Sequence, residues 1–454
     1  MKRICKILLL SLIIISNSNA TSLNDALAST YESNPSLNAT REELKATDEQ
    51  VMQALAKWLP SVGLDRTKQF IDSETFPTAS TGTPTKGAGT IDSLTVKQNL
   101  FRGGGDVATM KVAQYSIKQI RANLTSTEQK TLASAVEVYM RVLQTQEAYK
   151  MSQQKEKDIK HYVTAVTKRF EAGQNTKTDV AQAETSYADA IAYKATTYSS
   201  YRYFSALFLK VTGLEATNLS VPKDNLILPK TLDETTNIAL KQNPNLIAAK
   251  SKYEATDSAV GTHIASLLPT IDFQYSIQDY SNARNIIQTS THAKVSKTTA
   301  LSLNIPLFNG GANWSRTRES KRKAKQAKYD LNNTHNEVIA LAVQAWQESK
   351  SAKTSYDARK EGVKSAKIAY EGVIAEERGG LRDVTDVITI RNKYYEAVNA
   401  LLDARSTYFI KMYALKSQVG ECTAQGLNLD VELYDPLKNY KQIRWQFISA
   451  YTGD

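Results

Sequence analysis

Hydrophobic residues recur along this chain with two different spacings, one of two residues in short segments and one typical of helices in long segments. Directly after Pro269 the apolar residues occupy every second position through 271–277, and the same alternation returns at 301–307. A period of two places the apolar side chains on one face of a β-strand. Residues 61–101 carry a weaker version of this pattern. We therefore expect two β-hairpins, at about 61–101 and about 269–308, with strands of ~10 residues, the length that a tilted strand needs to cross a bilayer.

The longest segments of the chain have a helical period instead. No proline occurs from Gly311 to Glu377, and the apolar residues in the second part of this segment recur at spacings of three, four and seven. They are Val338, Leu341, Ala345, Ala352, Tyr356, Val363, Ala366, Tyr370 and Val373. This heptad spacing with small alanines is typical of long helices packed side by side. A helix of about 67 residues is ~100 Å long, which suits a tube or a rod better than a compact enzyme.

The order of these elements is present twice. Landmarks in residues 22–213 recur in the same order in residues 231–420, and each half predicts a helix, a strand, a loop, a strand, a very long helix, a short break and a long helix. In both halves Leu-Phe-x-Gly-Gly follows the second strand, and Gly-x5-Asp-Val marks the break between the helices. A unit of about 200 residues is too long for a solenoid repeat of 20–50 residues. The chain is therefore predicted to contain two copies of one supersecondary unit.

The duplication and the two ends of the chain predict five segments. They are a signal peptide at 1–20, a first structural repeat at 21–213, a linker at 214–230, a second structural repeat at 231–420 and a C-terminal tail at 421–454. Each repeat is expected to begin with a helix, to continue with its β-hairpin and to end in a long helical hairpin. The tips of the two helical hairpins are expected near 173–179 and near 380–386.

The N-terminus has the composition of a secretory signal peptide. Basic residues precede an apolar run at 7–15, and small residues lead to Ala20. No later stretch approaches the ~20 apolar residues of a membrane-spanning helix, so a chain that is integral to a membrane must span it as a closed β-barrel. Four strands are too few, because the smallest such barrels have about 8. Several chains would then share one barrel, and a soluble four-stranded sheet with one wet face is the alternative.

Charge and reactive residues exclude several other functions. The chain has a formal net charge of +11, and its lysines and arginines are spread among glutamates along helix-like segments. That distribution is typical of solvated helix faces, so no nucleic-acid partner is implied. The four histidines have no ligand spacing, so no metal site and no cofactor are predicted. No nucleophile-elbow or zinc-protease motif is present, and we expect no enzyme. Beyond the signal peptide Cys422 is the one cysteine, which excludes an internal disulfide.

Glycine pairs follow the second strand of each predicted β-hairpin. Gly103 and Gly104 in the first half correspond to Gly310 and Gly311 in the second. A phosphate-binding loop would need a Lys-Ser or Lys-Thr pair after its glycines, and neither follows here. We expect these four glycines to be swivels, at which the chain turns from a strand into a long helix.

The paired units, the two Leu-Phe-x-Gly-Gly motifs and the two Gly-x5-Asp-Val motifs resemble the outer membrane efflux protein family, the TolC-like channels. The resemblance covers residues 21–420. It implies a mainly α fold with a β-barrel portion, assembled as a homotrimer. The long helical hairpins would form a trimeric α-barrel, and four strands per chain would share one 12-stranded transmembrane β-barrel in the lipid of the outer membrane.

The resemblance also implies a function. Members of this family are exit ducts of tripartite efflux or type I secretion systems, and they work with a periplasmic adaptor protein and an inner-membrane transporter. They carry no cofactor and perform no chemistry. The chain would then be a passive channel of the cell outer membrane that projects into the periplasm and is gated at its helical tips. An exported structural or adhesive coiled-coil protein without a pore is the alternative, although it would not need duplicated amphipathic hairpins.

The resemblance places the channel entrance at the hairpin tips, where Gly173 and Gly380 end long helices. Asp386 is expected to project into the constriction, where three copies would form a ring of negative charge that attracts cations. Thr389 stands where well-studied members have a second aspartate, so a second acidic tier is not implied. For Asp179 a carboxylate in the first helical turn also suits the helix dipole and the free N–H groups, an interpretation that needs no gate.

Two further tip residues are expected to form a lock. Arg382 matches an arginine that in the family helps to hold neighbouring hairpins shut, here against Asp179 or its neighbours. Glu377 stands where the family often has a tyrosine of that lock, and its carboxylate would pair with Arg382 or Arg378. The alternative for Arg382 is an exposed charge without consequence.

Overall fold

The computed structural model describes residues 21–73, 85–282 and 294–443. The signal peptide expected at 1–20 lies outside the described residues, as do the outer ends of both β-hairpins and the last part of the expected tail. The chain divides into two compact units. Unit 1 comprises Met1–Asn38, Thr127–Gln242 and Ile339–Leu433, and unit 2 comprises Ala39–Ser126, Asn243–Val338 and Tyr434–Asp454. Each unit takes segments from both sequence repeats, so neither repeat is a compact unit by itself.

The two repeats contain the same elements in the same order. The first has α1 (Leu23–Ser33), α2 (Pro35–Ala56), β1 (Ser61–Ser73), β2 (Thr85–Arg102), α3 (Gly105–Glu171) and α4 (Lys177–Thr212). The second has α5 (Leu232–Gln242), α6 (Pro244–Ala265), β3 (Thr270–Asn282), β4 (Val295–Asn304), α7 (Ala312–Arg378) and α8 (Val384–Gln418), and α9 (Lys438–Ile443) follows in the tail. Corresponding helices of the first three pairs have 11, 22 and 67 residues in both copies. The expected duplication is therefore confirmed.

Each repeat changes from its first to its second helix at an Asn-Pro pair. The Asn34 side-chain oxygen accepts the Ser36 N–H at 3.0 Å, and the Asn243 oxygen accepts the Asn245 N–H at 2.9 Å. A proline is the first residue of both α2 and α6. Proline suits this position because its missing N–H would have no partner inside the helix. The Asn-Pro pairs therefore end one helix and begin the next.

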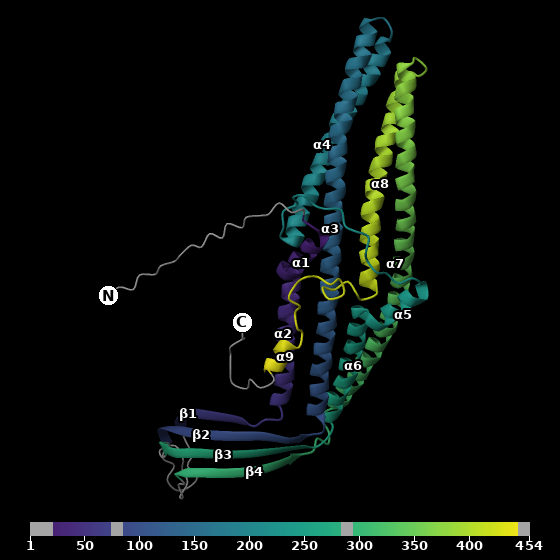
Figure 1. Cartoon of the computed structure of the whole chain (residues 1–454). Helices are drawn as coiled ribbons and strands as arrows, with labels where there is room; N and C mark the ends of the chain where they lie inside the picture. The colour runs from purple at the N-terminus through teal and green to yellow at the C-terminus, as the bar shows by residue number, and fades with distance from the viewer. Residues whose placement is uncertain (1–20, 74–84, 283–293, 444–454) are drawn as a thin grey trace, which may run out of the picture. The chain divides into compact units, whose positions relative to one another are not determined.

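Four antiparallel strands form one sheet in unit 2, in the order β1-β2-β3-β4 (Figure 1). The central pairing of β2 with β3 joins the two repeats. The register places Leu94 opposite both Leu64 and Ile277, and it places Phe273 opposite Leu301. The alternation in the sequence therefore produces one face of the sheet that is rich in apolar side chains.

Three strands are longer than the expected ~10 residues, and β1 and β3 have 13 residues each. β2 has 18 residues, and two irregularities in its pairing with β3 accommodate the additional length. β4 ends at Asn304, although the apolar alternation in the sequence continues to Leu307. Pro306 explains this early end, because proline has no N–H with which to continue the ladder.

The long helices pair as two helical hairpins, α3 with α4 and α7 with α8 (Figure 1). Small residues lie at their contacts in unit 1, and Ala183, Ala190, Ala345 and Ala352 are all buried. α4 also packs against α8, which brings the two hairpins together. No helix in the described ranges combines the length and the apolar character that crossing a membrane requires.

Candidate functional site

The first hairpin tip ends one helix with a glycine and begins the next with a capping box. Gly173 has φ +75°, and Gln174 donates its N–H to the Arg169 carbonyl at 2.8 Å, a C-terminal motif that favours glycine. At the start of α4 the Thr176 hydroxyl accepts the Asp179 N–H at 3.2 Å, and the Asp179 carboxylate accepts the Thr176 N–H at 2.8 Å. Asp179 thus has the capping role that helix chemistry alone explains.

The second hairpin tip has the same glycine but a different cap. Gly380 has φ +76° and ends α7 in the same way. The N-cap of α8 is Asp383, whose carboxylate accepts the Asp386 N–H at 2.8 Å. The Asp386 carboxylate does not return this bond, and instead it lies 3.5 Å from the Arg382 guanidinium with its side chain 46% exposed. The second tip therefore leaves the carboxylate of its aspartate partly exposed to solvent.

The Arg382 guanidinium stays within its own hairpin. Its Nε donates to Glu376 Oε2 at 2.8 Å, in addition to the contact with Asp386. The pairing with Asp179 that the resemblance suggested is not formed within the chain. The turn at Gly380 instead brings Arg382 back to the end of α7, where Glu376 lies. Thr389 lies one turn beyond Asp386 and is exposed.

A mostly buried ion pair joins the two hairpins at their tips. Glu377 is 9% exposed, and its carboxylate accepts hydrogen bonds from the Arg169 guanidinium, the longer one at 3.5 Å. This hydrogen bond raises the pKa of Arg169 above its usual range. The predicted pairing of Glu377 with Arg382 or Arg378 is therefore wrong. The Glu377 carboxylate binds Arg169 of the other hairpin. The preceding residue, Glu376, forms the ion pair with Arg382.

Sequence reasoning missed Arg169, because a basic residue in the last turn of a helix is common and favoured by the helix dipole. A signal was nevertheless present. Arg169 lies seven residues after the buried Tyr162 and three after the buried Val166, and Glu377 lies four residues after Val373. Both charged residues therefore continue the apolar stripe of their helix, which is the position of a side chain that faces the neighbouring helices.

An apolar cluster lies beside the ion pair, with Tyr162 close to both of its charges. Tyr162 and Val166 of α3, Ala183 of α4, and Val384 and Val387 of α8 are buried together, and partly buried residues of α7 pack against them. All four long helices thus contribute to one packed tip in unit 1. The Glu377 side chain is 7% exposed and that of Arg169 is 33% exposed, so burial of the carboxylate strengthens the attraction while the guanidinium still meets water.

A buried arginine lies farther along the same four helices. Arg391 of α8 is 5% exposed, and its guanidinium carbon lies 4.5 Å from the ring centre of Tyr162 and 5.9 Å from that of Tyr370. Nearby, the Tyr395 hydroxyl donates to Asp158 Oδ2 at 2.7 Å. Cation–π contacts of this kind are stronger when the cation is removed from water. These contacts tie α3 to α7 and α8 behind the tips.

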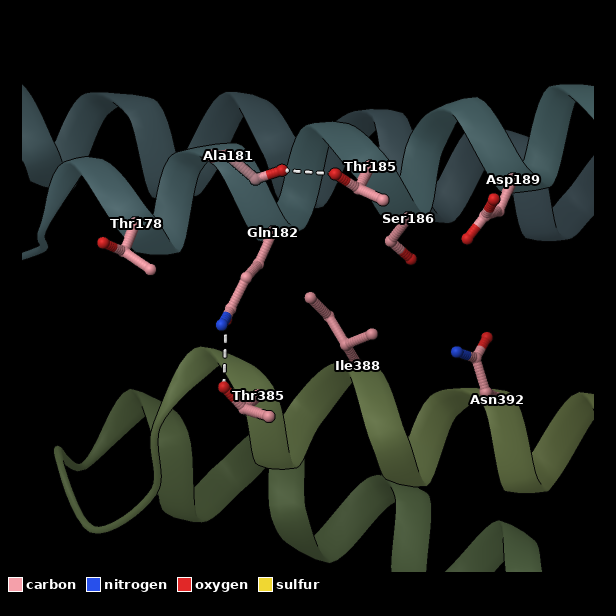
Figure 2. A pocket seen from close by; sticks show the side chains of 9 residues that line it. All are labelled: Thr178, Ala181, Gln182, Thr185, Ser186, Asp189, Thr385, Ile388 and Asn392. Carbon is pink, nitrogen blue, oxygen red and sulfur yellow. Dashed lines mark hydrogen bonds between the residues drawn. The ribbon is translucent and has the colours of Figure 1, made fainter.

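A groove of about 380 Å³ lies between α4 and α8 (Figure 2). Its lining consists of Thr178, Ala181, Gln182, Thr185, Ser186, Asp189, Thr385, Ile388 and Asn392. The Thr385 hydroxyl donates to the Gln182 side-chain oxygen at 3.0 Å and so bridges the two helices (Figure 2). Seven of these nine residues carry a hydroxyl, amide or carboxyl group, although carbon atoms make up most of the exposed lining. Within the described ranges no group of three metal-ligating side chains is placed to hold an ion.

The glycines after the second strand of each repeat have left-handed backbone conformations. Gly103 and Gly104 have φ +57° and +77°, and Gly310 and Gly311 have φ +56° and +78°. A Cβ atom on Gly103 would lie 2.7 Å from the Cβ of Leu268, so this position excludes larger residues. The four glycines thus turn the chain from the sheet into α3 and α7.

Known proteins are similar to this chain in sequence and in fold. The profile of the family described as outer membrane efflux protein matches residues 26–202 and 235–421. The chain is 28% identical over 458 residues to outer membrane efflux protein BepC of Brucella suis biovar 1 (strain 1330), covering 99% of this chain and 98% of BepC. It is 24% identical over 442 residues to outer membrane protein TolC of Escherichia coli (strain K12), covering 93% and 88%.

The fold is similar to that of the Campylobacter jejuni CmeC outer membrane channel, with a TM-score of 0.79 at 15% identity. The alignment covers 92% of this chain and 88% of that channel. The family profile matches both repeats, from α1 to α4 and from α5 to the end of α8. This chain therefore belongs to the outer membrane efflux protein family.

Proposed function

We propose that this chain forms, as a homotrimer, the outer membrane exit duct of a tripartite efflux or type I secretion system. One observation carries the proposal: a duplicated chain combines a sheet that has an apolar face with paired helical hairpins whose polar tips are joined. A periplasmic adaptor would connect the duct to an inner-membrane transporter, which supplies the energy. The duct itself is passive, so its side chains position and select but perform no chemistry.

The sheet supports the membrane placement. Val62, Leu64, Leu301 and Leu303 are between 61% and 78% exposed in the single chain, and exposed apolar residues in such numbers indicate a further partner or lipid. Among the described residues, β1 and β4 each have one edge without a partner strand. Three chains would pair these edges and close a barrel of twelve strands. Such a barrel provides hydrogen-bond partners for the backbone N–H and C=O groups and exposes the apolar face to lipid.

The hairpin tips support a gate at the periplasmic entrance. The Arg169–Glu377 pair holds the two hairpins of one chain together, so the tips separate only when this pair is broken. Three copies of Asp386 would form an acidic ring at the entrance. Such a ring concentrates cations and repels anions. Opening then requires relative movement of the hairpins, and the ring selects among small ions while the entrance is narrow.

Planar-bilayer recording of the purified, signal-cleaved trimer tests this function. We expect discrete conductance steps that prefer cations, because the entrance is acidic. A heat-dissociated sample of the same protein is the control and should be silent. Silence from an intact trimer would instead favour an exported structural coiled coil without a pore.

A further inference from the structure

The first turns of α7 carry more positive charge than the corresponding turns of α3. Seven of the thirteen residues 316–328 are basic and one is acidic, whereas the corresponding residues 109–121 of α3 include three basic residues. Both segments begin a 67-residue helix directly after a left-handed glycine pair. The two copies therefore have the same structural task, and the additional charge of the second copy indicates an additional partner.

One face of this helix is buried and a second face is charged. Thr317, Ser320, Ala324 and Ala327 are 5% to 6% exposed, and the Thr317 hydroxyl donates to the His263 carbonyl of α6 at 3.3 Å. About a quarter turn around the helix lies what we name the basic face. It consists of Trp314, Arg318, Lys321, Lys325 and Lys328, which are all exposed. Their spacings of four and three residues place all five side chains on one stripe.

Three lysines of the basic face line a groove of about 530 Å³ between α6 and α7. Tyr253 and Tyr329 also line it, together with one carboxylate, that of Asp257. Three ammonium groups against one carboxylate leave an excess of positive charge. Among the described residues neither Arg318 nor Lys321 forms an ion pair. The groove is therefore suited to an anionic group of moderate size.

The position of the basic face relative to the sheet indicates which anion it meets. Leu307 and Phe308 are 90% and 82% exposed, and Trp314 is 58% exposed. Exposed aromatic residues followed by basic ones are typical of the boundary between lipid and water. Arg318 and Lys321 lie about 10 and 15 Å along the helix from Gly311. Helical side chains lean toward the N-terminus, which here is toward the sheet.

We propose that the basic face of α7 binds the phosphate groups of anionic phospholipids, of the phosphatidylglycerol type, in the leaflet next to the helices. The inference rests on the proposed membrane placement of the sheet. Trp314 lies at the level of the lipid headgroups, and the lysines of the groove attract the phosphate below it. Charge complementarity selects the lipid, because a zwitterionic headgroup has no net charge for the basic face to attract.

Native mass spectrometry of the detergent-solubilised trimer tests this inference. The wild-type trimer is titrated with phosphatidylglycerol and, separately, with phosphatidylcholine, and the bound lipids are counted. We expect a preference for phosphatidylglycerol, and we expect the triple variant Arg318→Gln, Lys321→Gln, Lys325→Gln to weaken its binding at least about tenfold. The matched control is the triple variant Arg359→Gln, Lys360→Gln, Lys364→Gln. It removes the same number of positive charges from an exposed later part of α7 and should keep the preference for phosphatidylglycerol.

Each other outcome overturns the inference. Equal binding of phosphatidylglycerol by the triple variant and the wild type shows that the basic face does not hold the lipid. Dissociation of the triple variant, but not of the control, into monomers assigns the face to a subunit interface. Loss of adaptor binding with unchanged lipid binding assigns it to the adaptor. Bilayer conductance separates this failure from a failure of the proposed function, since a conducting trimer without lipid preference contradicts the lipid site alone.

Discussion

The two hairpin tips share one sequence motif but use its aspartate differently. In the first tip the carboxylate of Asp179 accepts the N–H of Thr176 and is held in a capping box. In the second tip the cap is Asp383, and Asp386 lies beside Arg382 instead. A carboxylate at the cap explains the difference, because two carboxylates in one capping box repel each other. The residue three positions before the aspartate therefore decides whether that aspartate is held in the capping box or stays free of it.

The same comparison separates the charged residues that join the hairpins from those that stay within one. Glu377 reaches Arg169 of the other hairpin from a mostly buried position. Glu376, its neighbour in the sequence, reaches Arg382 of its own hairpin with both side chains nearly half exposed. Exposed pairs contribute about 0–1 kcal/mol, whereas breaking a buried pair leaves an unpaired charge at a larger cost. The gate should therefore depend most on Glu377.

The largest expected effect comes from Glu377→Ala. The change leaves the Arg169 guanidinium without its partner and destabilises the closed tip by about 1–3 kcal/mol. We expect the open fraction in planar-bilayer recordings to rise at least about fivefold. Glu371→Ala, at an exposed position two turns earlier in α7, is the control and should resemble the wild type. Equal opening in both variants contradicts a gate at this pair.

Asp386→Asn should change ion selectivity without loosening the tip. A unit charge at ~4 Å in water contributes ~1 kcal/mol, so we expect the preference for cations over anions to fall roughly fivefold. Reversal potentials in a salt gradient measure this preference. The corresponding change in the first tip, Asp179→Asn, should leave the reversal potential unchanged. Equal shifts in the two variants would show that the tips do not differ as the caps indicate.

Asp383→Thr should convert the second tip into a copy of the first. A threonine at the N-cap with an aspartate three residues later reproduces the capping box, which draws the Asp386 carboxylate away from Arg382. We expect a selectivity loss smaller than that of Asp386→Asn, roughly twofold, measured in the same salt gradient. Thr176→Asp in the first tip is the reciprocal change. By the same rule it should free the Asp179 carboxylate from the capping box and add a second charge at that tip, so we expect the preference for cations to rise, and an unchanged preference contradicts the comparison.

Asp179→Ala should affect stability rather than transport. Loss of its contribution to the capping box costs about 0.5–1 kcal/mol at the start of α4. We expect hydrogen exchange to become faster in the first turn of α4, with reversal potentials unchanged. Exchange that remains as slow as in the wild type would remove the structural role of Asp179.

The smallest expected effect is that of Arg382→Ala. Its contacts with Glu376 and Asp386 are exposed and lie within one hairpin, where solvent weakens an ion pair. We expect a rise in the open fraction of less than about threefold, clearly below that of Glu377→Ala in the same bilayer recordings. An effect larger than that of Glu377→Ala would show that Arg382 holds a neighbouring chain.

Periodic features of the fold could be predicted from the sequence. The lack of proline and the heptad spacing between Gly311 and Glu377 predicted a helix of about 67 residues, and α7 has 67. The alternation after Pro269 predicted β3 and most of β4. The end of β4 was missed because Pro306 sits at an alternating polar position, where its missing N–H does not alter the hydrophobic pattern.

The pairing of charged residues could not be predicted as far. Arg169 and Glu377 lie 208 positions apart, and their contact depends on how two separate hairpins pack. Arg382 pairs locally because the turn at Gly380 returns the chain to Glu376, a geometry that residue types alone do not specify. The difference between Asp179 and Asp386 was readable in principle, since Thr176 and Asp383 are both visible in the sequence.

A reversible tether between the hairpins tests most directly that the tips are the gate of this duct. Thr385 and Gln182 contact each other across the groove at 3.0 Å, and in the described chain the one native cysteine, Cys422, is buried. The variant Gln182→Cys, Thr385→Cys is joined by a short reducible thiol cross-linker during bilayer recording. We predict that the conductance falls on cross-linking and recovers on reduction. Conductance that the tether does not change would contradict a gate between these hairpins.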